Sequence, residues 1–108
     1  MATIVAIIDG VQNTVNTAVD MYTSPAAGGG TRITSFTASL ITGTHTYRVF
    51  VGATAIAAKE IIPATGMRGP ENDSPLGIIG HLVPAGEKIF VQISTGTTIT
   101  VRATGTEL

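Results

Sequence analysis

Cysteine and tryptophan are absent from the chain, and charged side chains are scarce. Without cysteine there are no disulfides, no thiolate metal ligands and no cysteine nucleophile, so stability must come from packing or from assembly. Charged residues make up 12% of the 108 residues, against a usual fraction of about 25%, and the formal net charge is −1. Because threonine is abundant, these features predict a neutral surface that is rich in hydroxyl groups.

The few basic residues do not gather into a patch. They stand singly along the chain, at Arg32, Arg48, Lys59, Arg68, Lys88 and Arg102. Nucleic acid and anionic membranes attract clustered positive charge, so we expect neither as a partner. Residues 1–12 begin with apolar side chains but lack the basic segment and full apolar core of a signal peptide. No run approaches the roughly 20 residues of a membrane span, so we expect the chain to be used as written.

No arrangement of catalytic side chains stands out. The G-x-S-x-G motif is missing, and the spacing of serine, histidine and aspartate does not mark a nucleophile with its base. His45 and His81 are the only histidines, and Glu71 and Asp73 form the only close carboxylate pair. We therefore expect no enzyme activity, no cofactor and no metal.

Two features leave narrower alternatives open. Gly28–Gly30, followed by Thr31 and Arg32, could cradle a phosphate, but a cradle needs a helix after the glycines, and the following residues alternate as a strand does. A hairpin tip is the interpretation that we adopt. The stretch Glu71–Ser74 could hold Ca²⁺ within a loop, and the alternative is a solvated turn.

Apolar side chains recur at every second position in several segments, as in strands with one buried face. The segments are Val15, Thr17, Val19 and Met21; Phe36, Ala38 and Leu40; Tyr47, Val49 and Val51; Ile89, Val91 and Ile93; and Ile99, Val101 and Ala103. The intervening positions of the last two segments are mostly polar, which is typical of antiparallel sheets with one solvated side. Branched threonine and valine side chains also favour strands over helices.

Proline and glycine clusters separate these segments and predict chain reversals. About seven to eight short strands joined in this way indicate an all-β fold, an antiparallel β-sandwich or jelly roll, which residues 1–108 form as a single domain. Gly52–Glu60 is predicted as a strand, with a single helical turn as the alternative.

Two segments and two aromatic residues fall outside this pattern. Residues 1–12 are predicted to be an N-terminal arm or an edge strand, and Pro63–Pro75 to be a long irregular loop of the kind that carries contacts. Phe50 and Phe90 fall on the faces opposite the buried side of their strands. Each is either covered by the rest of the chain or exposed as part of a partner surface.

Two stretches together resemble small bacteriophage virion proteins. They are NTAVDMYTSPAAGGGTRITSFTASLITGTHTYRVFV and LVPAGEKIFVQISTGTTITVRATGTEL, and the resemblance extends from about Asn13 to Leu108. The shared pattern has Tyr-Thr-x-Pro-Ala-Gly before a strand with Ile-Thr-Ser, then Pro-Ala-Gly before another strand, and a closing strand that ends in Gly-x-Glu. The chain departs from the pattern in its Gly28–Gly30 turn and in Pro63–Pro75.

This resemblance implies a structural protein of the virion, made in the host cytoplasm. We expect a capsid decoration or cement protein that binds the major capsid protein on the outer capsid surface, commonly as a homotrimer. As its partner-binding residues we predict two patches, the N-terminal arm and the long loop. They comprise Ile4, Val5, Ile7 and Ile8 in the arm, and Met67 and Arg68 in the loop.

Two other functions remain as alternatives. A tail- or fibre-associated domain could bind a host glycan or act as an adaptor, although glycan sites usually present aromatic faces and the aromatic content is only 5%. A tail-tube or head-completion protein would form a stable ring with larger subunit interfaces.

Overall fold

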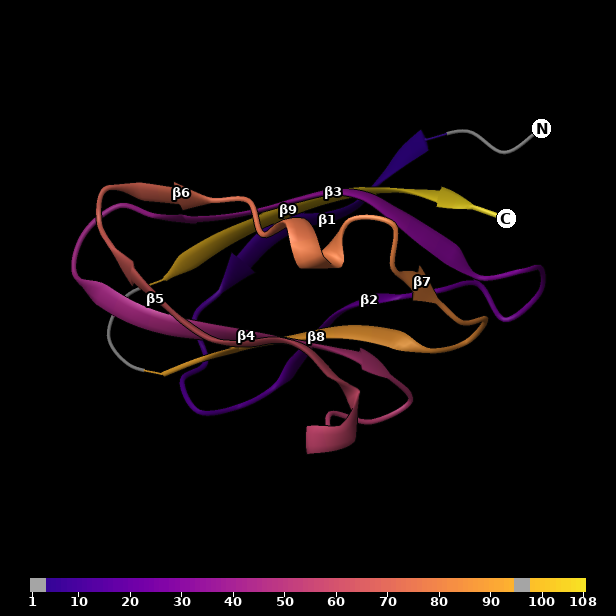
Figure 1. Ribbon diagram of the computed structural model, residues 1–108, viewed down its shortest axis with the longest axis horizontal. Coiled ribbons are helices and arrows are strands. Elements are labelled where there is room, and N and C mark those ends of the chain that lie inside the picture. Colours follow the sequence, from indigo (N-terminus) through magenta and orange to yellow (C-terminus); the bar gives the residue numbers. More distant parts are fainter. Residues whose placement is uncertain (1–3, 95–97) are drawn as a thin grey trace.

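The computed structural model describes residues 4–94 and 98–108. These residues form two antiparallel sheets that lie face to face (Figure 1). The strands are β1 (Ile4–Gln12), β2 (Val19–Thr23), β3 (Thr31–Leu40), β4 (Thr44–Gly52), β5 (Glu60–Arg68), β6 (Glu71–Asp73), β7 (Leu82–Val83), β8 (Lys88–Ile93) and β9 (Ile99–Glu107). Two short 3₁₀ turns, η1 (Ala57–Lys59) and η2 (Leu76–Ile78), complete the described elements.

The strand order is that of a jelly roll. One sheet has the order β1-β9-β3-β6, with β7 also paired to β3, and the other has the order β2-β8-β4-β5. The first long strand therefore pairs with the last, and the second pairs with the last but one. This interleaving of two Greek keys defines the jelly roll and confirms the predicted fold class.

The core lies between the sheets and is built by alternation. The predicted inward residues of β3, β4, β8 and β9 are all buried, and none is more than 6% exposed. They are Phe36, Ala38, Leu40, Tyr47, Val49, Val51, Ile89, Val91, Ile93, Ile99, Val101 and Ala103. Period-two patterning predicted these positions correctly because one face of each strand packs on the opposite sheet.

The prediction for the second strand was wrong at its start. Val15 and Thr17 are exposed, and the strand begins at Val19. The cause is the buried amide of Gln12, which donates hydrogen bonds to the carbonyl oxygens of Val91 (2.6 Å) and Thr17 (3.1 Å). The Gln12 side-chain oxygen accepts the backbone N–H of Thr14 at 2.7 Å. These bonds hold the chain in a turn where alternation predicted a strand.

The predicted loop Pro63–Pro75 was also wrong, because much of it is strand. β5 runs through Pro63 to Arg68, and β6 follows after a tight turn. Pro63 is tolerated since β5 is an edge strand and its pairing with β4 shifts register between Tyr47 and Val49, where a bulge removes the need for a donor. Before β5, η1 matches the helical-turn alternative.

The glycine-rich turn Gly28–Gly30 packs against Leu108 and is hydrogen-bonded to it. Gly29 N–H donates to the carbonyl of Leu108 at 3.0 Å, and Leu108 N–H donates to that of Gly30 at 2.8 Å. Gly28 and Gly30 have φ angles of +103° and +90°, and a Cβ on Gly30 would lie 2.5 Å from the backbone oxygen of Val83. The glycines therefore serve close backbone packing, and strand β3 follows them where a phosphate cradle requires a helix.

Substitution of Gly30 by alanine tests this close packing. Gly80 is the matched control, because its φ is +86° but a Cβ there meets nothing within 4 Å. We expect Gly80→Ala to lower the free energy of unfolding by about 1 kcal/mol from the left-handed backbone alone. Gly30→Ala should cost roughly 2 kcal/mol more from the clash. Chemical denaturation measures both, and equal losses would show that the contact with Val83 is unimportant.

Candidate interaction surfaces

The four residues predicted to form an N-terminal contact arm do not form one. They lie in β1, which pairs with β9 at the edge of its sheet. Ile7 and Ile8 are in the core, and Val5 packs against it. Only Ile4 is well exposed, at 66%. Ile7 and Ile8 are thus corrected to core residues, since a β-bulge after Ala6 turns both towards the interior.

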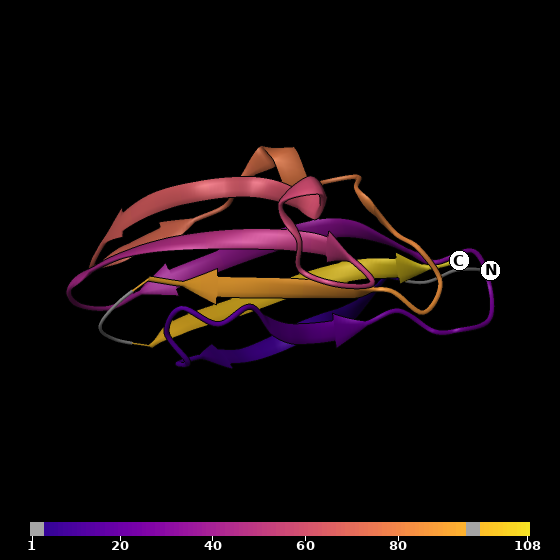
Figure 2. The same cartoon turned by 90° about the horizontal axis from the view of Figure 1, so that it is seen from below.

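The second predicted patch is also divided by the fold. Met67 is buried in the core, whereas Arg68 is exposed at the end of β5. Neighbouring residues of a strand point to opposite faces, so Met67 points to the core and Arg68 alone presents an exposed side chain. Figure 2 shows β5 along one long side of the sandwich and β1 with β2 along the other, so the structure does not join the two predicted patches.

Two turns at one end of the sandwich form a single unit, which we call the contact tip (residues 41–43 and 68–71; left in Figure 1). Gly69 N–H donates to the carbonyl of Gly43 at 2.8 Å. A Cβ on Gly69 would lie 2.6 Å from the backbone of Ile41, so the turns are in close contact. Ile41 is 77% exposed beside Arg68, an apolar side chain held on a fixed backbone. Sequence patterning missed Ile41, and its only signal was an apolar residue placed directly before Thr42-Gly43.

A groove of about 550 Å³ adjoins the contact tip. Its walls come from β4, β5, β6 and the end of β8, and consist of Thr44, His45, Thr46, Gly66, Met67, Arg68, Glu71 and Ser94. The Arg68 backbone N–H donates to Glu71 Oε1 at 2.7 Å, which fixes the acidic side chain at the rim. The exposed lining of the groove is more apolar than polar, and its hydroxyl, carboxylate and guanidinium groups are the few polar groups that could orient a bound ligand.

The carboxylates of the predicted calcium alternative are both committed to the chain itself. Glu71 accepts the bond from Arg68, and Asp73 accepts a hydrogen bond from the hydroxyl of Tyr47. Across residues 4–94 and 98–108, no group of three or more histidine, aspartate or glutamate side chains is placed to hold a metal ion. Glu71–Asp73 form the short strand β6, whose first two residues are exposed, so the stretch is not the solvated turn of the other alternative.

The Tyr47–Asp73 bond ties the two sheets together. Tyr47 belongs to β4 and is fully buried, while Asp73 belongs to β6 in the opposite sheet. Burial, and then the hydrogen bond and negative charge of Asp73, raise the pKa of Tyr47 far above its ordinary value of 10.0. The tyrosine is therefore held in its neutral, donating form.

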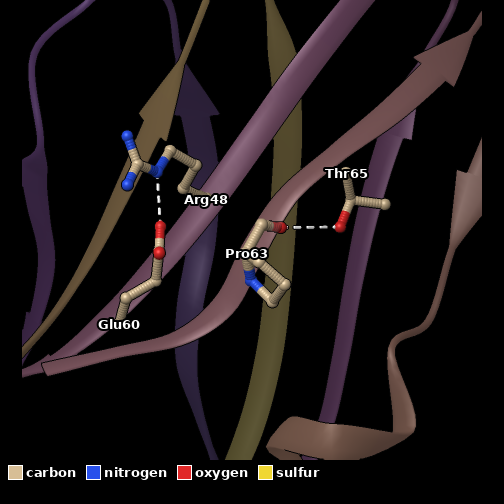
Figure 3. A network of polar contacts seen from close by, with 4 residues as sticks. All are labelled: Arg48, Glu60, Pro63 and Thr65. Atoms are coloured by element: carbon tan, nitrogen blue, oxygen red, sulfur yellow. Dashed lines mark hydrogen bonds and ion pairs between the residues drawn. The ribbon is translucent and has the colours of Figure 1, made fainter. Parts of the chain in front are cut away.

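The outer face of the β2-β8-β4-β5 sheet carries both aromatic residues that the sequence left open. Phe50 and Phe90 are cross-strand neighbours, Phe50 is 4% exposed and Phe90 is half-buried. The Arg48 guanidinium lies 5.4 Å from the centre of the Phe50 ring and forms an ion pair with Glu60. Figure 3 shows this ion pair beside Pro63, whose carbonyl accepts the Thr65 hydroxyl at 2.8 Å. Phe50 is thus covered by its own chain.

No protein-family model, curated protein or solved structure matches the chain. Among the residues described, no helix is long and apolar enough to cross a membrane.

Removal of the Tyr47 hydroxyl tests the link between the sheets. Tyr47→Phe should cost about 1–2 kcal/mol at neutral pH, because Asp73 loses a buried donor. When the pKa of a tyrosine is higher in the folded than in the unfolded protein, its contribution to the free energy of unfolding is complete below the unfolded-state pKa. That contribution is lost as the pH rises towards the folded-state pKa. The wild type should therefore lose about 1.4 kcal/mol at pH ~11 through Tyr47, and the variant should not.

Urea denaturation of both proteins between pH ~7 and ~11 measures this difference. The difference in the free energy of unfolding between wild type and variant should stay constant up to pH ~9 and decrease above it, since the tyrosine of the unfolded chain ionises near pH 10. A difference that stays constant to pH ~11 would contradict the raised pKa.

Proposed function

We propose that the protein is a non-enzymatic structural protein of a bacteriophage virion, a decoration or cement protein that binds the major capsid protein on the outer capsid surface. The resemblance of Asn13–Leu108 to small virion proteins supports this function. The jelly-roll strand order is the observation that carries it, because this fold is widely used in viral shells and the resemblance contains little besides strands and turns.

The outer face of the β1-β9-β3-β6 sheet also supports a role in presenting surfaces. On β3 and β9 its side chains are largely hydroxyls, namely Ser35, Thr37, Ser39, Thr100, Thr104 and Thr106, and Arg102 is paired with Asp9 of β1. Thr104 exchanges hydrogen bonds with Thr34 at 2.8 Å and with Ser35 at 2.6 Å. Such a face stays hydrated without net charge, which suits a protein that is displayed in many copies on a shell.

The contact tip is the surface that we assign to the capsid. Ile41 supplies an exposed apolar anchor and Arg68 a flanking charge, a combination common at the energetic centre of protein interfaces. Binding only to the assembled lattice would stabilise that lattice by mass action. Many identical sites on one shell would add up even where each is weak.

A cryo-electron map of the parent virion tests the location. Regular density of this sandwich over the head, with the contact tip towards the shell, is the expected result. Density confined to the tail would overturn the decoration function.

Variants of the contact tip test the assigned surface. With heads that lack the protein, Ile41→Asp and Arg68→Glu should each lower co-sedimentation of added protein roughly tenfold or more. Leu76→Asp is the matched control, because Leu76 is 85% exposed on η2, away from the contact tip, and should bind as the wild type does. Equal losses in all three variants would argue against the contact tip.

The groove beside the contact tip favours one alternative, a tail- or fibre-associated domain that binds a host glycan or serves as an adaptor. Its arginine, glutamate and threonine groups match the donors and acceptors of a sugar. Binding of the isolated protein to a glycan array, lost in Glu71→Gln, would support this alternative.

A further inference from the structure

The sandwich has five edge strands among its described residues, and four of them, including the two-residue strand β7, are protected against pairing with another chain. β5 contains Pro63 and two register shifts. β6 has three residues, and β2 has five with a register shift after Asp20. Short length, proline and bulges are the usual means by which proteins prevent edge-to-edge association.

The fifth edge strand, β1, is long and weakly protected. It has nine residues without proline or lysine, and its one charged residue, Asp9, is paired with Arg102 of β9 at 3.1 Å. Ile4 and Val11 are 66% and 55% exposed near its two ends. Apart from β9, no strand pairs with β1 in the described part of the chain, so one row of its backbone groups lacks a strand partner. A long apolar edge of this kind is a site for strand addition.

The bulge in β1 makes this edge complementary to itself. Seven positions separate Ile4 from Val11, so a regular strand would place them on opposite faces. The extra residue between Ala6 and Ile8 brings both onto the outer face, where they pair with Thr106 and Thr100. When Ala6 and Ile7 are counted as one position, Ile8 is the centre of the segment 4–11.

We infer that β1 pairs antiparallel with β1 of a second copy, about a two-fold axis at Ile8, to form a dimer with one continuous sheet. In this register Ile4 of each copy lies opposite Val11 of the other, which covers both exposed apolar side chains. Asp9 lies opposite Ala6, so no like charges meet. A register centred on Asp9 would place two carboxylates against each other.

The inner face of β1 agrees with the same register. Val5 falls opposite Gly10 of the other copy, and both are half-buried in the single chain. A Cβ on Gly10 would meet nothing within 4 Å, so there is room for the valine side chain. The dimer does not depend on attachment to a capsid, and β1 lies along the long side of the sandwich opposite β5, so the contact tip stays free.

This geometry differs from the trimer that the resemblance implies. Antiparallel pairing of identical strands uses the free edge of both copies and closes at two. Pairing through one strand gives an interface at the small end of the usual range, so we expect a dimer that forms at roughly 10–100 µM. Sedimentation velocity of the full chain over this range should show the mass rising to twice 11.0 kDa.

Charge substitutions on the edge test the register. Ile4→Lys and Val11→Glu should each weaken dimerisation about tenfold, because each buries an unpaired charge opposite an apolar side chain. The double variant Ile4→Lys/Val11→Glu should recover most of the loss, since the introduced lysine of one copy then faces the introduced glutamate of the other. Leu76→Lys is the matched control and should dimerise as the wild type does. A chain that stays at 11.0 kDa, a trimer, or a double variant no better than the singles would each overturn the inference.

A covalent test uses the absence of natural cysteine. In Ile4→Cys/Val11→Cys, the two thiols of one chain lie about 20 Å apart along β1 and cannot bond to each other, whereas the proposed register brings each opposite its counterpart in the second copy. Oxidation should give a dimer on a non-reducing gel. Efficient dimerisation by Ile4→Cys alone, which would need Ile4 to face itself, would contradict the register.

Discussion

The structure depends on the position of β9 between β1 and β3. This strand is hydrogen-bonded on both sides, from Ile4↔Thr106 to Gln12↔Ile99 and from Thr31↔Glu107 to Ser39↔Thr100. Neither β1 nor β3 has another long strand beside it in that sheet. The two strands therefore cannot join into one hydrogen-bonded sheet until β9, the last strand along the chain, lies between them. Most contacts of the fold join residues far apart in sequence. Such topologies fold slowly, because distant segments must meet before any pairing is gained.

The buried positions of the strands could be predicted from the sequence, but the turns, bulges and edge positions could not. Alternation located residues such as Tyr47, Val91 and Val101 because burial on one face imposes a period of two. It failed at Val15, since the turn there depends on one buried amide, Gln12, which bonds to Thr14 and Thr17 of the turn and to Val91 of β8. It failed again at Pro63, because only the strand order shows that β5 is an edge where proline is allowed.

The candidate surfaces were harder to predict than the core for the same reason. Ile7 and Ile8 are part of an apolar arm by sequence pattern, yet a bulge that no local pattern indicates directs both inward. Met67 and Arg68 were predicted as a loop patch, but strand geometry separates them onto opposite faces. Exposure of Ile41 follows from the contact between two turns that are 26 residues apart at Gly43 and Gly69. A sequence pattern predicts which residues are buried, whereas the residues of an exposed surface depend on which distant segments the fold brings together.

The first and last described residues leave the sandwich side by side. Ile4 lies opposite Thr106 in the register of β1 and β9, at the end away from the contact tip (Figure 1). A short peptide could therefore join the two ends without crossing either sheet, and new ends could be opened in the exposed turn at Ala85-Gly86. The fold therefore permits circular permutation. A domain fused before Ile4 or after Leu108 would lie at the end of the sandwich opposite the contact tip.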